Sequence, residues 1–240
     1  MKIDASGIDF QTLNQRIKSS EEKEVIIDNC IGQRFIGSGL SDKYIEINGV
    51  PGNALGCYLD NSVIRVNGNS QDATGDTMNQ GRIYIHGSAG DATGYGMRGG
   101  KIMIEGNTGY RAGIHMKAYQ DNIPVLVIGG VAGSFLGEYQ AGGTIVILNL
   151  YQTNLPIAGN FCATGIHGGK IFLRTDEPGL RLPKQVISKK ATAEDLQEII
   201  PHVEEFCKEF GCNLDNVMNH TFYVLTPNTK NPYKQLYNYN

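Results

Sequence analysis

A 19-residue repeat of paired apolar residues is the sequence feature that most restricts the fold of this chain. Successive pairs begin 19, 19, 19, 24, 19 and 26 residues apart, so the period is 19 with two insertions. The first members of the pairs are Ile45, Ile64, Ile83, Ile102, Leu126, Ile145 and Ile171. A period near 20 with one alternating apolar segment predicts a parallel β-solenoid, because a single repeat cannot bury its own core.

Glycine follows the same period. Of the 31 glycines, 28 lie between Gly32 and Gly169, well above the ordinary share of about 7 %. The pattern G-x-x-G-x-x-x-G occurs in four complete copies: Gly49-Gly52-Gly56, Gly87-Gly90-Gly94, Gly106-Gly109-Gly113 and Gly130-Gly133-Gly137. A fifth copy keeps the outer glycines, Gly68 and Gly75, but has Gln71 at the middle position. A turn that recurs in every repeat needs the same positive φ or close backbone approach each time.

The repeat also fixes a predicted register. We expect residues 45–173 to stack so that each strand lies beside its equivalent in the next repeat, about 4.8 Å away. Two inward columns follow, Ile45-Ile64-Ile83-Ile102 and Ile47-Val66-Ile85-Ile104, with Glu46, Arg65, Tyr84 and Met103 pointing outward. A leucine-rich repeat has a similar period, but its L-x-x-L-x-L pattern is absent from the sequence.

A short amphipathic segment precedes the repeats. Phe10, Leu13 and Ile17 fall on one face of a helix over Asp9–Lys18, and Asp9 is a suitable N-cap. We predict a helix there that covers the first repeat.

A longer helical pattern follows the repeats. Thr192 and Asp195 form a capping-box variant, and apolar residues recur at helical spacing from Leu196 to Phe210, with Pro201 as a point of division. We expect this helix to pack on the repeats, where it can cover an open end, or on a second copy of the chain. A strand over 221–225 comes next. The chain then has a tyrosine-rich, extended end with Tyr233, Tyr237 and Tyr239. The predicted organisation is an N-terminal cap (1–24), a repeat domain (25–175) and a C-terminal region (176–240).

Composition disfavours several classes of protein. The net charge is −3 and 19 % of residues are charged, which is unlike the basic surface of a nucleic-acid-binding protein. No apolar run approaches the 18 or so residues of a membrane span, and Met1–Phe10 does not resemble a signal peptide. The five cysteines are scattered and odd in number, so they predict neither a disulfide framework nor a zinc ribbon. We therefore expect a cytoplasmic protein that binds neither nucleic acid nor membranes.

Candidate chemistry is sparse. Gly94–Gly99 matches the dinucleotide string G-x-G-x-x-G, but a strand rather than a helix follows it, so we interpret it as a turn of the repeat. In the repeat register Asn67, His86 and Glu105 occupy equivalent positions, and His86 beside Glu105 is the candidate proton-transfer pair. A second polar column contains His115, Tyr139 and His167. Solvated surface is the simpler interpretation of both columns, and no metal site is predicted because the five histidines share no ligand spacing.

The order, spacing and insertions of these repeats over about residues 25–175 resemble a known family. It is the C-terminal domain of the glutamate synthase large subunit, which is similar to the C-type subunit of formylmethanofuran dehydrogenase. The helix after the repeats and Pro232-Tyr233 look like a stand-alone archaeal-type version, while Gln71 and Ile123-Pro124 depart from the pattern. The segments that carry the resemblance include Asn29-Cys-Ile-Gly-Gln-Arg34, Gly87-Ser-Ala-Gly-Asp-Ala-Thr-Gly94, Met97-Arg-Gly-Gly-Lys101, Asn160-Phe-Cys-Ala-Thr-Gly165 and Gly168-Gly169.

The resemblance to this family implies both a fold class and a role for the chain. It implies an all-β, right-handed parallel β-helix of about 19-residue coils, with short N-terminal and C-terminal helical caps. It also implies a structural subunit or spacer in an amidotransferase or oxidoreductase assembly, with glutaminase and/or FMN-containing synthase subunits as partners. In glutamate synthase the catalytic cysteine, the FMN barrel and the iron–sulfur cluster belong to other domains, and this chain begins Met1-Lys2. The resemblance therefore assigns no catalytic residue and no cofactor.

A second function stays open at this point, an independent carbohydrate-active enzyme. Such an enzyme requires two carboxylates that face each other across a substrate. The repeats supply Glu46, Asp60, Asp72, Asp76, Asp91 and Glu105, without a sequence pattern that pairs any two.

Overall fold

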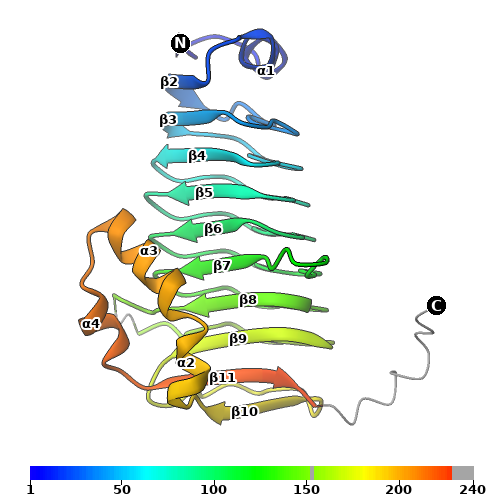
Figure 1. Ribbon diagram of the computed structural model, residues 1–240, viewed down its shortest axis with the longest axis vertical. Helices are drawn as coiled ribbons and strands as arrows, with labels where there is room; N and C mark the ends of the chain where they lie inside the picture. The colour runs from blue at the N-terminus through cyan, green and yellow to red at the C-terminus, as the bar shows by residue number, and fades with distance from the viewer. Residues whose placement is uncertain (152–153, 229–240) are drawn as a thin grey trace, which may run out of the picture.

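The computed structural model describes residues 1–151 and 154–228 (Figure 1). Its described strands form one 11-stranded sheet in the order β1-β2-β3-β4-β5-β6-β7-β8-β9-β11-β10. Strands β1 to β9 pair in parallel, each with the next along the chain. Their bounds are β1 Lys2–Asp4, β2 Glu24–Ile31, β3 Tyr44–Val50, β4 Ser62–Asn67, β5 Gly81–Ile85, β6 Lys101–Ile104, β7 Val125–Ile128, β8 Ala141–Ile147 and β9 Gly168–Arg174. The predicted tyrosine-rich end lies outside the described residues.

The predicted fold class, an all-β right-handed parallel β-helix with helical caps, is wrong. The sheet is open, with β1 at one edge and β10 (Val186–Lys190) at the other. It is mixed, because β11 (Phe222–Pro227) runs antiparallel to β9, and β10 runs antiparallel to β11. Helices also accompany the strands of the described chain: α1 (Phe10–Ser19), α2 (Ala193–Gln197), α3 (Ile200–Phe210) and α4 (Leu214–Met218). A sequence period gives the offset between paired strands. It does not determine the direction of a strand that follows the last repeat.

The register predicted between the repeats is confirmed. Ile45 lies opposite Ile64, and the same row continues through Ile83, Ile102, Leu126, Ile145 and Ile171. All members of the two predicted inward columns are fully buried in one core cluster. Isolated parallel bridges repeat the same stacking in the turns, from Ser70 through Ala89, Thr108 and Ala132 to Ala158. The 19-residue period therefore aligns the turns as well as the strands.

The helix predicted before the repeats is confirmed. Asp9 caps α1, since its side chain accepts hydrogen bonds from the backbone N–H groups of Gln11 and Thr12. Leu13 and Ile17 are buried in the same core cluster as the inward columns. This helix thus covers the β1–β2 end of the core (Figure 1).

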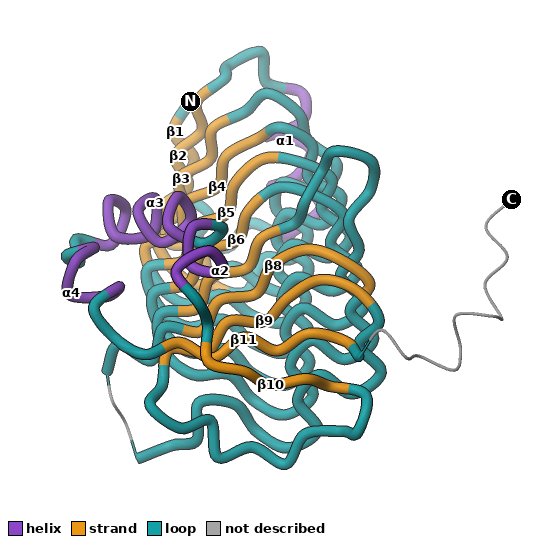
Figure 2. Tube along the Cα trace, turned by 60° about the horizontal axis from the view of Figure 1, so that its bottom comes forward, coloured by secondary structure: helices purple, strands orange, loops and turns teal. Residues whose placement is uncertain are grey.

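The second predicted helix packs on the repeats as expected, but it lies on a face of the sheet and not over its end. The helices α2, α3 and α4 gather on one side of the strands, and the turns of the repeats lie on the other (Figure 2). Tyr84 and Met103, expected to point outward, are 5 % and 0 % exposed because Val203 and Phe206 of α3 pack over them in a second core cluster. The apolar side of α3 is therefore buried within one chain, and β11 rather than a helix pairs with the edge of β9.

Candidate functional site

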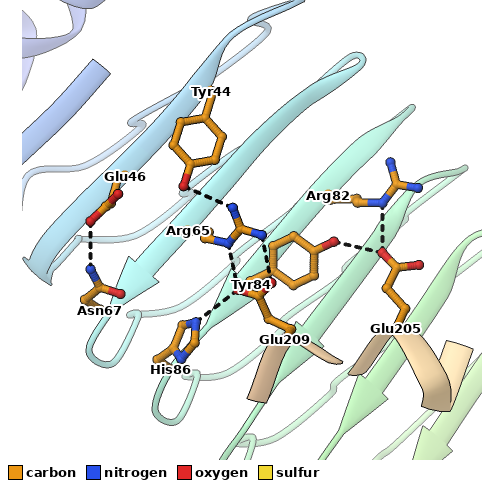
Figure 3. A network of polar contacts seen from close by, with 9 residues as sticks. All are labelled: Tyr44, Glu46, Arg65, Asn67, Arg82, Tyr84, His86, Glu205 and Glu209. Carbon is orange, nitrogen blue, oxygen red and sulfur yellow. Dashed lines mark hydrogen bonds and ion pairs between the residues drawn. The ribbon is translucent and has the colours of Figure 1, made fainter. Parts of the chain in front are cut away.

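A polar network joins α3 to the strands that it covers (Figure 3). Glu209 accepts two hydrogen bonds from Arg65, with Nε–Oε1 2.7 Å and Nη2–Oε2 2.8 Å, and its Oε1 lies 3.1 Å from Nε2 of His86. Arg65 also donates to the hydroxyl of Tyr44 at 3.0 Å. This bidentate pair is the strongest kind of charge-assisted contact.

A second carboxylate, Glu205, lies one helical turn before Glu209 and joins two more strands. Its Oε1 accepts hydrogen bonds from Nε of Arg82 and from the hydroxyl of Tyr84, both at 2.8 Å, and its Oε2 lies 2.5 Å from Nζ of Lys101. Arg82 and Lys101 are register partners on β5 and β6. Parallel strands separated by about 4.8 Å allow one carboxylate to reach both of these cations.

Both carboxylates are held in the charged form. Hydrogen bonds from Arg65 lower the pKa of Glu209 against the opposing effect of burial. Burial alone would raise the pKa of Glu205, but its hydrogen bonds with Lys101, Tyr84 and Arg82 outweigh this and lower it. The network consequently binds the helix to the sheet by paired charges at neutral pH.

We expect Glu209→Gln to reduce the free energy of unfolding by about 1–3 kcal/mol at neutral pH, because it removes a charge-assisted pair. A lowered folded-state pKa stabilises the protein above the unfolded value of about 4.3, and that stabilisation is lost as the pH falls through the folded pKa. Urea unfolding at about pH 7 and about pH 3 should therefore show a difference between variant and wild type that shrinks in acid. Glu204→Gln on the exposed side of the same helix is the matched control. An equal loss for both variants would contradict the role of the pair.

The predicted candidates His86 and Glu105 directly follow the paired residues Ile85 and Ile104 of the neighbouring strands β5 and β6. Both lie in the described part of the chain, and no hydrogen bond or ion pair joins them. His86 instead contacts Glu209 and packs edge-on against Phe210, with ring centroids 4.8 Å apart. Glu105 lies at a groove of about 410 Å³ that is also lined by Arg174 and Cys212. Asn67, the third member of the predicted column, donates to Asn48 and Glu46 on β3.

Sequence reasoning missed Glu205 and Glu209, which lie more than 100 residues from their partners. The sequence does contain a pattern that could have identified these two glutamates as partners of the strand residues. The two acids are four residues apart, so they lie on the same side of a helix. Arg65, Arg82 and Lys101 lie on consecutive strands of the repeat. Acids on one side of a helix and bases on one face of a sheet indicate a docking surface.

The turn side of the molecule carries exposed aromatic rings, which we call the aromatic stripe. Its members are 41–58 % exposed and are Phe35, Tyr58, Tyr95, Tyr110, Tyr139 and Phe161. They span seven successive turns, or roughly 30 Å at about 4.8 Å per repeat. His115 stacks on Tyr139 at 5.2 Å, and Phe135 stacks on Phe161 at 5.0 Å. The second predicted column thus contributes His115 and Tyr139 to this surface, while Nδ1 of His167 lies 3.0 Å from the carbonyl oxygen of Gly165.

Three of the candidate carboxylates, Asp72, Asp76 and Asp91, accept hydrogen bonds from other residues of the turns. Oδ1 of Asp72 accepts a hydrogen bond from the N–H of Asp91 at 2.9 Å, and Oδ1 of Asp91 accepts one from Tyr110 at 2.8 Å. Asp76 accepts a hydrogen bond from the hydroxyl of Thr77. These contacts link one turn to the next or stabilise the turn itself, and they do not form a facing acid pair.

The nucleotide-like string lies in a turn. Gly94 and Gly96 have φ of +71° and +57°, and the string leads into β6 rather than into a helix. This is the context expected for a repeat turn and not for a dinucleotide site.

Metal-ligating groups do not converge anywhere in residues 1–151 and 154–228, where no three His, Cys, Asp or Glu side chains could share a metal ion. The same residues include no helix with the length and apolar character that a bilayer span requires.

The chain is similar to known proteins over most of its length. Residues 13–229 match the family described as GXGXG motif. A relative from Methanocaldococcus jannaschii, "Uncharacterized protein MJ1350", is 43 % identical over 98 % of this chain and 95 % of its own length. A chain of the formyltransferase/hydrolase complex (FhcABCD) from Methylorubrum extorquens, solved with methylofuran, shares the fold, with a TM-score of 0.59 and 18 % identity over 92 % of this chain and 89 % of that one. The chain belongs to the GXGXG motif family, in agreement with the sequence resemblance to the glutamate synthase C-terminal domain.

Proposed function

We propose that this chain is a non-catalytic structural or partner-binding subunit of a glutamate synthase-like amidotransferase or oxidoreductase assembly in the cytoplasm. Its partners would be glutaminase and/or FMN-containing synthase subunits. The family supports the type of assembly. The similar chain from Methylorubrum extorquens belongs to a multi-subunit complex, which supports a subunit role by analogy of fold.

The aromatic stripe is the observation that carries the proposal. Interfaces are enriched in aromatic residues, and exposed apolar side chains that gather on one surface mark sites that bind partners. The stripe residues belong to the turns, which lie on the side of the strands away from α3 (Figure 2), and their side chains are exposed. A second copy of the chain is not needed to cover α3, because Val203 and Phe206 are fully buried within one chain.

The side chains of the polar network support a structural role. Arg65, Arg82, Glu205 and Glu209 are all engaged in contacts that hold α3 in place. The turn carboxylates are engaged with the turns, so the carbohydrate-active alternative gains no support from them. We keep the division into 1–24, 25–175 and 176–240 as a prediction within this proposal.

The test is recovery of partners by the affinity-tagged full chain from its native source, identified by mass spectrometry. Tyr58→Ser with Tyr110→Ser should lower the recovery of glutaminase or FMN-containing subunits at least tenfold, since interface aromatic residues often contribute about 2 kcal/mol each. Tyr119→Ser is the matched control, because Tyr119 is 57 % exposed but lies outside the stripe.

Two results would contradict the proposal. The first is equal recovery of partners by the stripe variant and by the wild type. The second is activity of the isolated chain, seen as stoichiometric FMN binding or as ammonia release from glutamine. Loss of such activity in His86→Ala or Glu105→Ala would then identify an enzyme.

A further inference from the structure

Two cysteine thiols lie against each other where α3 ends. The Sγ atoms of Cys207 and Cys212 are 2.7 Å apart. A disulfide requires about 2.05 Å, so a further approach of about 0.7 Å would bring the sulfurs to bonding distance. Cys207 is 5 % exposed, whereas Cys212 is half-buried at the groove that Glu105 and Arg174 also line. The pair is thus open to solution on the side of Cys212.

The backbone explains why these two positions meet. Gly211 ends α3 with φ +75°, and its N–H donates to the carbonyl oxygen of Cys207 at 2.9 Å. The N–H of Cys212 donates to the same oxygen at 3.1 Å. In this type of helix end the residue after the glycine contacts the residue five positions earlier. The sequence C-x-x-x-G-C therefore places the two thiols side by side.

The other three cysteines have different surroundings. Cys30, Cys57 and Cys162 are buried, and burial raises the pKa of each thiol. The thiols of Cys30 and Cys57 donate to Gln33 and Ser38 rather than to another sulfur. A paired, partly accessible arrangement is found at Cys207 and Cys212.

We propose that Cys207 and Cys212 form a reversible disulfide by exchange with a low-molecular-weight or protein disulfide. The thiolate of Cys212 attacks the external disulfide, which gives a mixed disulfide and releases one thiol. The thiolate of Cys207 then attacks Sγ of Cys212 and releases the second thiol. In total, two protein thiols lose two electrons and two protons, and the external disulfide becomes two thiols.

The order of these steps follows from exposure. Burial and the neighbouring Cys212 raise the pKa of Cys207 to about 12, so Cys207 is the poorer first nucleophile. Once Cys212 carries the mixed disulfide, Cys207 is already beside the sulfur that it must attack.

The disulfide would lie beside the polar network that joins α3 to the sheet. It would join α3 to the residue after its glycine cap, next to Glu209 and Phe210, both of which contact His86. Oxidation would therefore fix the end of α3 that lies over the sheet, and reduction would release that constraint.

Trypsin provides a direct test, because it cleaves after Lys190, Lys208 and Lys230 and places the two cysteines in separate peptides, 191–208 and 209–230. The purified full chain is treated with oxidised glutathione, alkylated under denaturing conditions, digested and analysed by mass spectrometry. Before alkylation, we expect the intact mass to fall by two hydrogen atoms. After alkylation and digestion, we expect three alkylated thiols in place of five and a link between the two peptides. Dithiothreitol should reverse all three changes.

Variants separate this site from the other cysteines. Cys212→Ser should abolish the linked peptides, and Cys57→Ser should leave them unchanged. The proposal is overturned if wild-type protein retains five free thiols, if Cys212 stops at a stable glutathione adduct, or if the disulfide joins two chains on a non-reducing gel. None of these results depends on the partners proposed above.

Discussion

Gly81→Ala is expected to reduce the free energy of unfolding by roughly 2–6 kcal/mol. Gly81 begins β5 opposite Ser62 of β4 and has φ +101°. A Cβ atom there would lie 2.2 Å from the carbonyl oxygen of Ser62 and 2.9 Å from its nitrogen. Those atoms belong to a paired strand and cannot rotate away. The strain of the positive φ and the contact with the backbone therefore add together.

Gly39→Ala separates the two contributions. Gly39 also has a positive φ, +62°, but a Cβ atom there would meet nothing within 4 Å. The conformational cost alone is about 1–2 kcal/mol. Urea unfolding followed by circular dichroism should rank the wild type first, Gly39→Ala second and Gly81→Ala last. Equal losses for the two variants would mean that the close approach between β4 and β5 is not what selects glycine.

Much of the strand pairing could be predicted from the sequence, because parallel pairing of equivalent repeats requires only a constant offset. The pairs Ile45–Ile64 and Ile83–Ile102 have that offset, and the structure pairs them. The direction of β11 could not be predicted in this way. β11 belongs to no repeat, and its antiparallel pairing depends on the path of the chain through α2, α3 and α4.

The covered face could be predicted only in part. Alternation identifies the two sides of a strand but not whether the second side is covered. The row that begins with Glu46 and Arg65 becomes apolar at Met103, Val127 and Val146. A row that changes from charged to apolar indicates that a covering element lies over the later repeats. The helical spacing of Leu196 to Phe210 supplied that element, but the contacts that place it join residues too distant in sequence for a periodicity to reveal.

The candidate site shows the same limit. The repeat register correctly made His86 and Glu105 equivalent in position, since their strands are neighbours. It could not show that Glu209 approaches from outside the repeat and contacts His86, 123 residues away. Polar partners across a docked helix depend on the tertiary position of that helix, which local patterns do not specify.

Phe206→Ala is the second substitution for which we expect a large effect, about 3–5 kcal/mol. Phe206 is fully buried between α3 and the sheet, and its ring packs on Phe210 with centroids 4.6 Å apart. Its Cζ lies close to the backbone at Gly129, where a Cβ atom would come within 2.8 Å of it. Truncation would leave a cavity that the rigid strands below cannot fill. Urea unfolding measures the loss.

Phe161→Ala is the control for this change, because Phe161 is 58 % exposed on the aromatic stripe. Removing the same atoms there should cost less than about 1 kcal/mol, as is usual for exposed positions. Amide hydrogen exchange would show where the Phe206 variant is weakened. Faster exchange confined to α3 means that the helix can leave the sheet while the repeats persist, and faster exchange throughout β5 to β8 means that the covered face and the repeats unfold together. A loss for Phe206→Ala no larger than that for Phe161→Ala would show that α3 does not stabilise the sheet.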